Sequence, residues 1–206
     1  DIPVIAEESV AAGVVPDITG KAFFLVDPLD GTKEFINRRE DFTVNIALVE
    51  EGVPVAGIVY APAKGVAYRT TAGGAEKLIV TDGVVARSEA IRCRPRGEVL
   101  TAVASRSHNS PETEAFMRQI GVSDFTSVGS SLKFCLLAEG VADVYPRFGR
   151  TMEWDTAAGD AILRAAGGTT ECADNTVFAY GKTRQDTDSD FANPPFIGWA
   201  HPVSRR

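Results

Sequence analysis

Two aspartates lie three positions apart, directly after an apolar run, in the stretch FLVDPLDGTKEF that covers residues 24–35. The apolar run has the length of a buried strand, and Pro28 cannot donate a hydrogen bond within a sheet, so we predict that the strand ends near Asp27. The following Asp30-Gly31-Thr32 predicts a turn that leads into a helix with free backbone N–H groups. Acids beside such a helix start could hold a cation and an anion together.

Magnesium chemistry fits this pattern. Mg²⁺ prefers hard oxygen ligands, usually a few carboxylates completed by water and substrate phosphate. Asp27 and Asp30 flank one turn and can share such ions, and the carbonyl group of Leu29 can add a further oxygen. Separately, the backbone N–H groups of Gly31 and Thr32 can receive a phosphate at the helix start. The stretch therefore indicates a metal site that handles phosphate.

Two further acidic elements could join this site, the pair Glu7-Glu8 and Asp155, which begins a predicted helix. Each element also has a simpler interpretation. The glutamates could be surface charge, Asp30-Gly31 an ordinary turn, and Asp155 an ordinary helix N-cap. The residues taken alone leave these alternatives open.

Composition narrows the class of protein. The chain has 206 residues and a formal net charge of −7, which argues against nucleic-acid binding as its main function but allows a small anionic substrate. Its three cysteines (Cys93, Cys135 and Cys172) form no C-x-x-C pair, which favours a reducing compartment over a zinc site or a disulfide framework. No apolar stretch approaches the roughly 20 residues of a membrane span, and no signal peptide is recognisable. We expect a cytoplasmic protein, with peripheral association with the inner membrane as an alternative.

Hydrophobic patterning divides the chain into two halves. Residues 43–69 alternate between apolar and polar and contain turn signals, which predicts an antiparallel meander. The polar segment 85–98 contains Pro and Gly and favours a boundary, so we predict subdomains at 1–96 and 97–206. Beyond it, strands alternate with three helices, the first with Ser110 as N-cap and Pro111 at its first position. The halves therefore read as antiparallel α+β followed by α/β.

One phosphatase motif can be set aside. DPLDGT is similar to the D-x-D-G-T motif of haloacid-dehalogenase phosphatases, in which the first Asp becomes phosphorylated. Here the two acids are one residue further apart, which moves the second acid out of the geometry that the motif requires.

A more specific resemblance covers nearly the whole chain. AEES, VDPLDGTKEF and WDTAAG resemble, in the right order, the three metal-binding motifs of the inositol monophosphatase superfamily of lithium-sensitive, magnesium-dependent phosphatases. LVDPLDGTKEFINRREDFTVNIALVEEGVPVAGIVYAP, SRSH, GSSLKFCLLAEGVADVYPRFG and WDTAAGDAILRAAGG resemble its bacterial 3'(2'),5'-bisphosphate nucleotidase branch. Inositol phosphatases of the superfamily usually carry T-T-N-F where this chain has TKEF.

The resemblance implies a layered α/β/α/β/α sandwich and a set of site residues. It assigns two or three Mg²⁺ ions to Glu7, Asp27, the Leu29 carbonyl group, Asp30 and Asp155. Glu7 with Thr32 would position and activate the attacking water, with Asp30 completing the catalytic set, and Gly31 with Thr32 would cradle the scissile phosphate. The nucleotide would contact His108, Ser130, Lys133, Arg147 and Asp155.

Four of these substrate residues also have simpler interpretations. Ser130 could be only a helix cap, Lys133 a solvated residue of a first helical turn, and Arg147 the partner of any surface acid. His108 could be a general base, but a substrate contact or an ordinary loop residue is the better interpretation, because metal-bound water is acidic without help from histidine.

The expected activity is removal of the 3'-phosphate from adenosine 3',5'-bisphosphate, and from 3'-phosphoadenylyl sulfate, by a monomer or homodimer that binds a small nucleotide and no nucleic acid. One alternative is an inositol or sugar phosphate phosphatase on the same scaffold. The resemblance also implies further helices and one more acidic residue ahead of Pro3, which we expect this chain to lack. The other alternative is therefore an inactive nucleotide-binding module.

Overall fold

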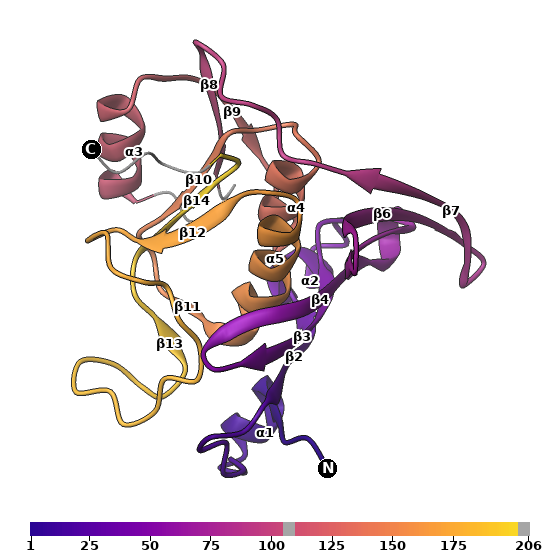
Figure 1. The fold of residues 1–206 in the computed structure, drawn as a ribbon, viewed down its shortest axis with the longest axis vertical. Helices are drawn as coiled ribbons and strands as arrows, with labels where there is room; N and C mark the ends of the chain where they lie inside the picture. Colours follow the sequence, from indigo (N-terminus) through magenta and orange to yellow (C-terminus); the bar gives the residue numbers. More distant parts are fainter. Residues whose placement is uncertain (105–109, 202–206) are drawn as a thin grey trace.

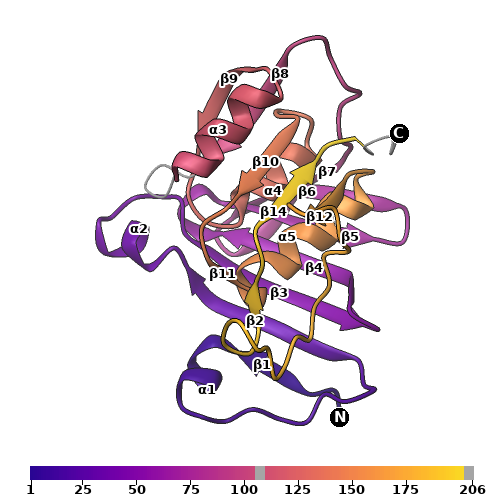
Figure 2. The same cartoon turned by 90° about the vertical axis from the view of Figure 1, so that its left-hand side faces the viewer.

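A computed structural model describes residues 1–104 and 110–201 as two β-sheets with helices packed between them. Helices α4 (Leu132–Ala138) and α5 (Glu153–Ala165) lie between a seven-stranded and a five-stranded sheet (Figures 1 and 2). Helix α5 contacts strands of both sheets, and α3 (Pro111–Gln119) contacts the smaller sheet from its other side. The predicted mixed α/β sandwich is confirmed.

The large sheet is a meander in which strands follow one another in sequence order. Only its first pair, β1 with β2, is parallel among the described strands, and the later pairs are antiparallel. Its strands are β1 (Val4–Ala6), β2 (Phe23–Asp30), β3 (Thr43–Glu50), β4 (Val53–Ala61), β5 (Val66–Thr71), β6 (Gly74–Thr81) and β7 (Val84–Ile91). Because β7 occupies half of the predicted boundary segment 85–98, the connection to the second half is shorter than expected.

Strand β2 does not end near Asp27, and that prediction is wrong. The strand continues to Asp30, and its pairing with β3 shifts between Asp27, opposite Asn45, and Asp30, opposite Thr43. Pro28 has no N–H group to donate, so the regular ladder is lost for the residues between these pairs and resumes after them. The proline produces an irregularity within the strand instead of its end.

The smaller sheet has the order β12-β14-β10-β8-β9 and mixes both pairing directions. Strand β8 is parallel to β9 and β10, whereas β14 is antiparallel to β10 and β12. Its strands are β8 (Leu100–Ala104), β9 (Val122–Ser127), β10 (Val144–Arg147), β12 (Thr169–Cys172) and β14 (Phe196–Trp199). The remaining elements are α1 (Glu7–Ala11), α2 (Thr32–Ile36), the 3-10 turn η1 (Pro62–Lys64) and the pair β11 (Thr151–Met152) and β13 (Ala192–Asn193).

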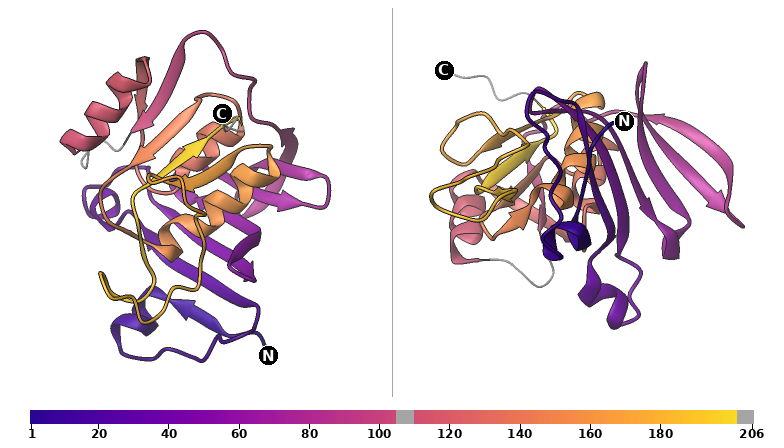
Figure 3. Two further views of the ribbon diagram at one scale, coloured as in Figure 1. Left: turned by 60° about the vertical axis from the view of Figure 1, so that its left-hand side comes forward. Right: turned by 90° about the horizontal axis from the view of Figure 1, so that it is seen from below.

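The two faces of the large sheet differ. The inner face packs on α5, whereas Ile46 and Ile58 on the outer face are 38% and 37% exposed. Within the described residues no helix layer covers this outer face (Figure 3), where the five-layer expectation places helices. None of the described helices is long and apolar enough to cross a membrane.

Helix α5 approaches the large sheet closely because Gly57 of β4 has no side chain. A Cβ atom at this position would lie 2.5 Å from the carbonyl oxygen of Ala158 and 2.9 Å from the Cβ atom of Ala161. Both partners belong to α5, whose first turn carries Asp155. The contact therefore fixes the distance between the sheet and the helix that brings an acidic residue to it.

Replacing Gly57 with Ala should destabilise the protein. The added methyl group meets backbone atoms that cannot rotate away, and overpacking of this kind costs about 1–3 kcal/mol. Thermal unfolding followed by circular dichroism should show a Tm lower by several degrees, at about 2–4 °C per kcal/mol for a chain of this size. Gly97→Ala is the matched control, since its nearest contact would be an ordinary 3.6 Å. Equal Tm values for both variants would contradict the close contact.

Candidate active site

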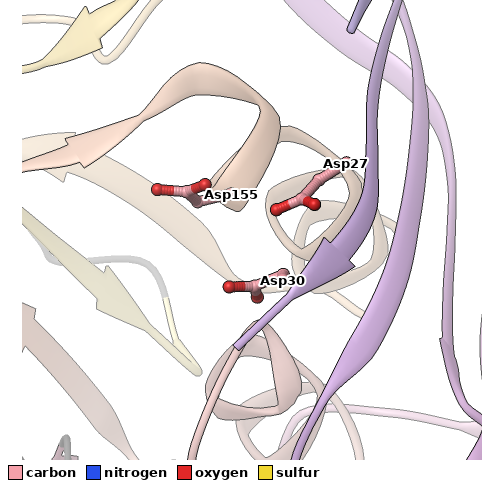
Figure 4. Close-up of side chains that lie close together, drawn as sticks. All are labelled: Asp27, Asp30 and Asp155. Atoms are coloured by element: carbon pink, nitrogen blue, oxygen red, sulfur yellow. The ribbon is translucent and has the colours of Figure 1, made fainter. Parts of the chain in front are cut away.

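Three aspartates gather between the end of β2 and the start of α5 (Figure 4). Asp27 and Asp30 flank the irregularity in β2, and Asp155 lies in the first turn of α5. Each offers a carboxylate oxygen, and these oxygens lie within 4.8 Å of one another. Asp27 is only 1% exposed. The chain thus brings together three of the acids that its sequence singled out.

Asp30 is held by one of its two carboxylate oxygens. Its Oδ2 accepts hydrogen bonds from Ser130 Oγ at 2.5 Å and Ser131 N at 2.8 Å, and Ser131 Oγ lies 3.1 Å from it. Two longer contacts, both 3.4 Å, come from Thr43 Oγ1 and Asn45 Nδ2 of the neighbouring strand β3. None of these bonds uses Oδ1, so Asp30 is oriented while one oxygen keeps its lone pairs for another ligand.

Asp155 is not the N-cap of α5, which corrects that alternative. The N-cap is Met152, and Asp155 occupies the third helical position, from which its Oδ2 accepts a hydrogen bond from Met152 N at 2.7 Å. This bond satisfies one of the free N–H groups at the helix start and fixes the carboxylate there. Asp27 is fixed in a similar way, because its Oδ1 accepts a hydrogen bond from Leu29 N at 2.9 Å.

Burial and repulsion raise the pKa values of two of these acids, Asp27 and Asp155. Burial, followed by the charge of Asp30, raises the pKa of Asp27 to about 8. Burial and the charge of Asp30 also raise the pKa of Asp155. Lys133 and Arg147 supply some positive charge nearby, but neither forms a direct ion pair with these carboxylates, and a divalent cation would supply the missing counter-charge. The donor set, with hard oxygens only, therefore fits an ion such as Mg²⁺.

Glu7 lies beside this trio without belonging to it. It is exposed at the start of α1, and burial, followed by the charge of Glu8, raises the pKa of its carboxyl group. A hydrogen bond with Asp27 acts in the opposite direction. Thr32 begins α2, and its Oγ1 donates to the carbonyl oxygen of Leu29 at 3.4 Å. Both residues are thus next to the acidic cluster.

A cavity of about 240 Å³ adjoins Asp30 and Asp155. Residues of both halves of the chain line it, including Gly31, Thr32, Ser130, Lys133, Tyr145 and Arg147. Gly31 adopts φ 87°, a left-handed conformation that favours glycine, and a Cβ atom there would lie 3.3 Å from the Asp41 carbonyl oxygen. Because Asp30 and Asp155 contribute negative charge to the lining, a small anion bound there needs nearby cations to offset it.

Lys133 is not a solvated residue, which corrects that simpler interpretation. It is 5% exposed, and its Nζ donates to the Ser130 carbonyl oxygen at 2.6 Å and lies 5.4 Å from the centre of the Tyr145 ring. Burial lowers its pKa to about 8. Arg147 Nη2 donates to the Arg150 carbonyl oxygen, while its buried Nε has no hydrogen-bond partner in the described part of the chain.

The serines before α4 do not cap it. Ser131 occupies the N-cap position without a side-chain cap bond, and Ser130 adopts φ 56°. The Ser130 hydroxyl group turns to Asp30 instead, and the Ser131 hydroxyl group lies between Asp30 and the Asp155 carbonyl oxygen, so the interpretation of Ser130 as a simple cap is wrong. His108 lies outside the described residues.

Sequence reasoning missed Thr43, Asn45 and Ser131. Residues of β3 alternate between the inside and the outside, and Thr43 and Asn45 take inward positions, at 0% and 1% exposed. Polar groups at such positions require partners, so polar residues in the inward register were the signal for this support of Asp30. Ser131 gave no comparable signal, because serine before a helix suggests a cap.

The sequence matches the model of the inositol monophosphatase family over residues 1–195, and the chain belongs to this family. Members of the family are metal-dependent phosphatases, and the acidic trio is a candidate site for the metal.

Several relatives are similar over most of the chain. It is 51% identical over 167 residues to the 3'(2'),5'-bisphosphate nucleotidase CysQ of Salmonella typhimurium and 48% identical to that of Escherichia coli K12; each match covers 81% of this chain and 65% of the relative. The chain thus spans less than two thirds of these proteins. The crystal structure of CysQ from Bacteroides thetaiotaomicron, 41% identical, has a TM-score of 0.83 over 98% of this chain and 78% of its own. The Thermotoga maritima IMPase, at 24% identity and a TM-score of 0.71 over 97% and 70%, shows the same fold.

Stability of the metal-free protein should fall as the pH rises through neutrality. The pKa of Asp27 is about 8 in the folded protein and near 3.8 in the unfolded chain, so between these values the folded state keeps a proton that the unfolded chain has released. Mg²⁺ competes with that proton, so its stabilising effect should be larger at about pH 8 than at about pH 5.

The measurement is Tm with and without Mg²⁺ at both pH values, using wild type and Asp27→Asn, which has no titrating group at this position. The variant should lose the Mg²⁺ effect and a large part of the pH dependence. A Mg²⁺-induced rise in Tm that is the same at both pH values would show that the cation does not replace the proton of Asp27.

Proposed function

We propose that the protein is a Mg²⁺-dependent phosphomonoesterase that removes the 3'-phosphate of adenosine 3',5'-bisphosphate, leaving AMP, and acts likewise on 3'-phosphoadenylyl sulfate. The observation that carries this proposal is the convergence of Asp27, Asp30 and Asp155 beside a cavity whose lining also includes Lys133 and Arg147. Anion-binding cations next to an acidic cluster suit a substrate with more than one phosphate. The similarity to proteins named 3'(2'),5'-bisphosphate nucleotidase supports the choice of substrate.

The metal ligands in this proposal are Glu7, Asp27, the carbonyl oxygen of Leu29, Asp30 and Asp155, which would hold two or three ions. Bound Mg²⁺ supplies an acidic water as nucleophile and stabilises charge on the phosphate and the leaving oxygen. The raised pKa values of Asp27 and Asp155 support this assignment, because a cation relieves the repulsion that raises them.

The chain's own groups bind and orient the phosphate. Gly31 and Thr32 line the cavity next to Asp30, and their backbone N–H groups suit the scissile phosphate. Glu7, with an elevated pKa, would accept the proton of the attacking water, and Thr32 Oγ1 would orient that water. The in-line displacement needs no phosphoenzyme, because the aspartates serve as ligands and not as nucleophiles.

The rest of the nucleotide would contact His108, Ser130, Lys133, Arg147 and Asp155. Arg147 is the residue best suited to a second phosphate, because the guanidinium group binds phosphate through paired N–H donors and its Nε is unpartnered within the described residues. Lys133 would act as a buried positive charge behind the cavity, since its Nζ already donates to the Ser130 carbonyl oxygen.

Phosphate release from adenosine 3',5'-bisphosphate in the presence of Mg²⁺ is the primary test, with inositol 1-phosphate as the competing substrate. Wild type should prefer the nucleotide and lose activity with a chelator. Asp30→Asn should lose at least about 100-fold in kcat, since metal-held charge stabilisation supplies several kcal/mol. Calorimetric titration with the nucleotide separates hydrolysis from mere binding. Binding without turnover would support the inactive module, and preference for inositol 1-phosphate would support the other phosphatase class.

Arg147→Ala should weaken use of the bisphosphate selectively. Loss of one charge-assisted hydrogen bond, worth about 1.5–3 kcal/mol, should lower kcat/KM for adenosine 3',5'-bisphosphate by roughly 10- to 150-fold. 3'-AMP lacks the 5'-phosphate and should be used nearly as well as by wild type. Arg118→Ala is the control, because this arginine is 73% exposed on α3. An equal loss for both substrates would assign Arg147 to the reaction or the fold.

A further inference from the structure

We propose that Ser131 and Asn45 are positioning residues that set the separation of Asp30 and Asp155 through a chain of buried hydrogen bonds. The inference deepens the proposed function, on which its kinetic readout rests, while its metal-binding readout does not depend on any substrate.

Ser131 connects the two sides of the acidic cluster. Its Oγ lies 2.5 Å from the backbone carbonyl oxygen of Asp155 and 3.1 Å from Asp30 Oδ2, to which its backbone N–H also donates at 2.8 Å. Asp30 belongs to the large sheet and Asp155 to the first turn of α5. One residue, 3% exposed, therefore contacts both acidic residues from a third element, the start of α4.

Asn45 determines how Ser131 uses its single proton. Asn45 Nδ2 donates to Ser131 Oγ at 2.9 Å, so the hydroxyl oxygen serves as the acceptor in this bond. A hydroxyl group has one proton to donate. The 2.5 Å distance favours the Asp155 carbonyl oxygen over Asp30 Oδ2 as its acceptor, while the Ser131 N–H group serves Asp30. The order of donation thus runs from Asn45 to Ser131 to Asp155.

The buried side chain of Asn45 is unfavourable for the stability of the fold, which indicates that it has a different function. It is 1% exposed, and its Oδ1 is buried without a hydrogen-bond partner in the described part of the chain. Reversing the amide would place Oδ1 where Nδ2 now lies, 3.4 Å from Asp30 Oδ2. Both oxygens are acceptors, so this orientation is unfavourable. An apolar residue would avoid the buried unsatisfied acceptor. Apart from its longer contact with Asp30, the amide therefore has its value in the direction that it gives to the Ser131 hydroxyl group.

Asn45 also lies opposite Asp27 in the pairing of β2 with β3. Its backbone thus adjoins one candidate metal ligand, Asp27. Its side chain contacts Ser131, which holds the other two, Asp30 and Asp155. A small change in this chain of bonds would alter the spacing of Asp30 and Asp155, and Mg²⁺ tolerates little departure from its preferred geometry.

The test is Mg²⁺ binding by calorimetry, without substrate, in wild type, Ser131→Ala, Asn45→Ala and the double variant. Each single variant should weaken Mg²⁺ affinity roughly 10-fold, as expected for one hydrogen bond in a charged site. The double variant should be only slightly weaker than Ser131→Ala, because Asn45 acts chiefly through its 2.9 Å bond to Ser131 and its direct contact with Asp30 is the longer one, at 3.4 Å. Thr113→Ala, which removes a buried hydroxyl of α3, controls for general destabilisation and should keep wild-type affinity.

A kinetic readout separates positioning from catalysis. With adenosine 3',5'-bisphosphate, the variants should need more Mg²⁺ for half-maximal rate and should recover most of the wild-type kcat at saturating Mg²⁺. If wild type binds Mg²⁺ but hydrolyses no phosphate ester, the proposed function fails and the affinity series still decides this inference. The inference would be overturned if Ser131→Ala or Asn45→Ala kept wild-type Mg²⁺ affinity, or if the losses in the double variant were additive. It would also be overturned if wild type bound no Mg²⁺. Circular dichroism identifies a variant that does not fold, and the other single variant then decides.

Discussion

Repulsion between closely spaced carboxylates is the constraint on which the rest of this structure depends. Two unit charges about 5 Å apart repel each other by about 3 kcal/mol at an effective dielectric constant of about 20, and the oxygens of Asp27, Asp30 and Asp155 lie within 4.8 Å of one another. A fold of marginal stability keeps such a cluster only if other contacts hold it in place. The packing of α5 on β4 and the donors around Asp30 Oδ2 provide these contacts.

The cluster draws its members from different layers of the fold. Asp27 and Asp30 come from the large sheet, Asp155 comes from α5, and the serines that hold Asp30 precede α4. No single element contains a binding site by itself. The site therefore forms only when both halves of the chain have packed, so cation binding and tertiary structure must be thermodynamically linked.

Features that local chemistry determines could be predicted from the sequence. Ser110 does accept from Thr113 N as an N-cap ahead of Pro111, and the alternating residues of the meander form consecutive antiparallel strands. The acidic trio could be predicted from its motifs, whereas its support could not. Ser131 contacts Asp155, which is 24 residues away along the chain, and Asp30, which is 101 residues away. A local sequence pattern cannot predict contacts between residues so far apart in the chain. The burial of Lys133 was missed for the same reason.

The irregularity in β2 also limits how this stretch of chain can change in length. Side chains along a strand alternate between its faces, so one inserted or deleted residue turns every later side chain to the opposite face. Asp27 and Asp30 are separated by an odd step, and the shifted pairing around Pro28 brings both into one cluster. Substitution of the Leu29 side chain would change only what lies between the acids. An insertion or deletion there would remove Asp30 from its five contacts with β3 and the serines, so Leu29 should tolerate a change of residue type far better than the segment tolerates a change of length.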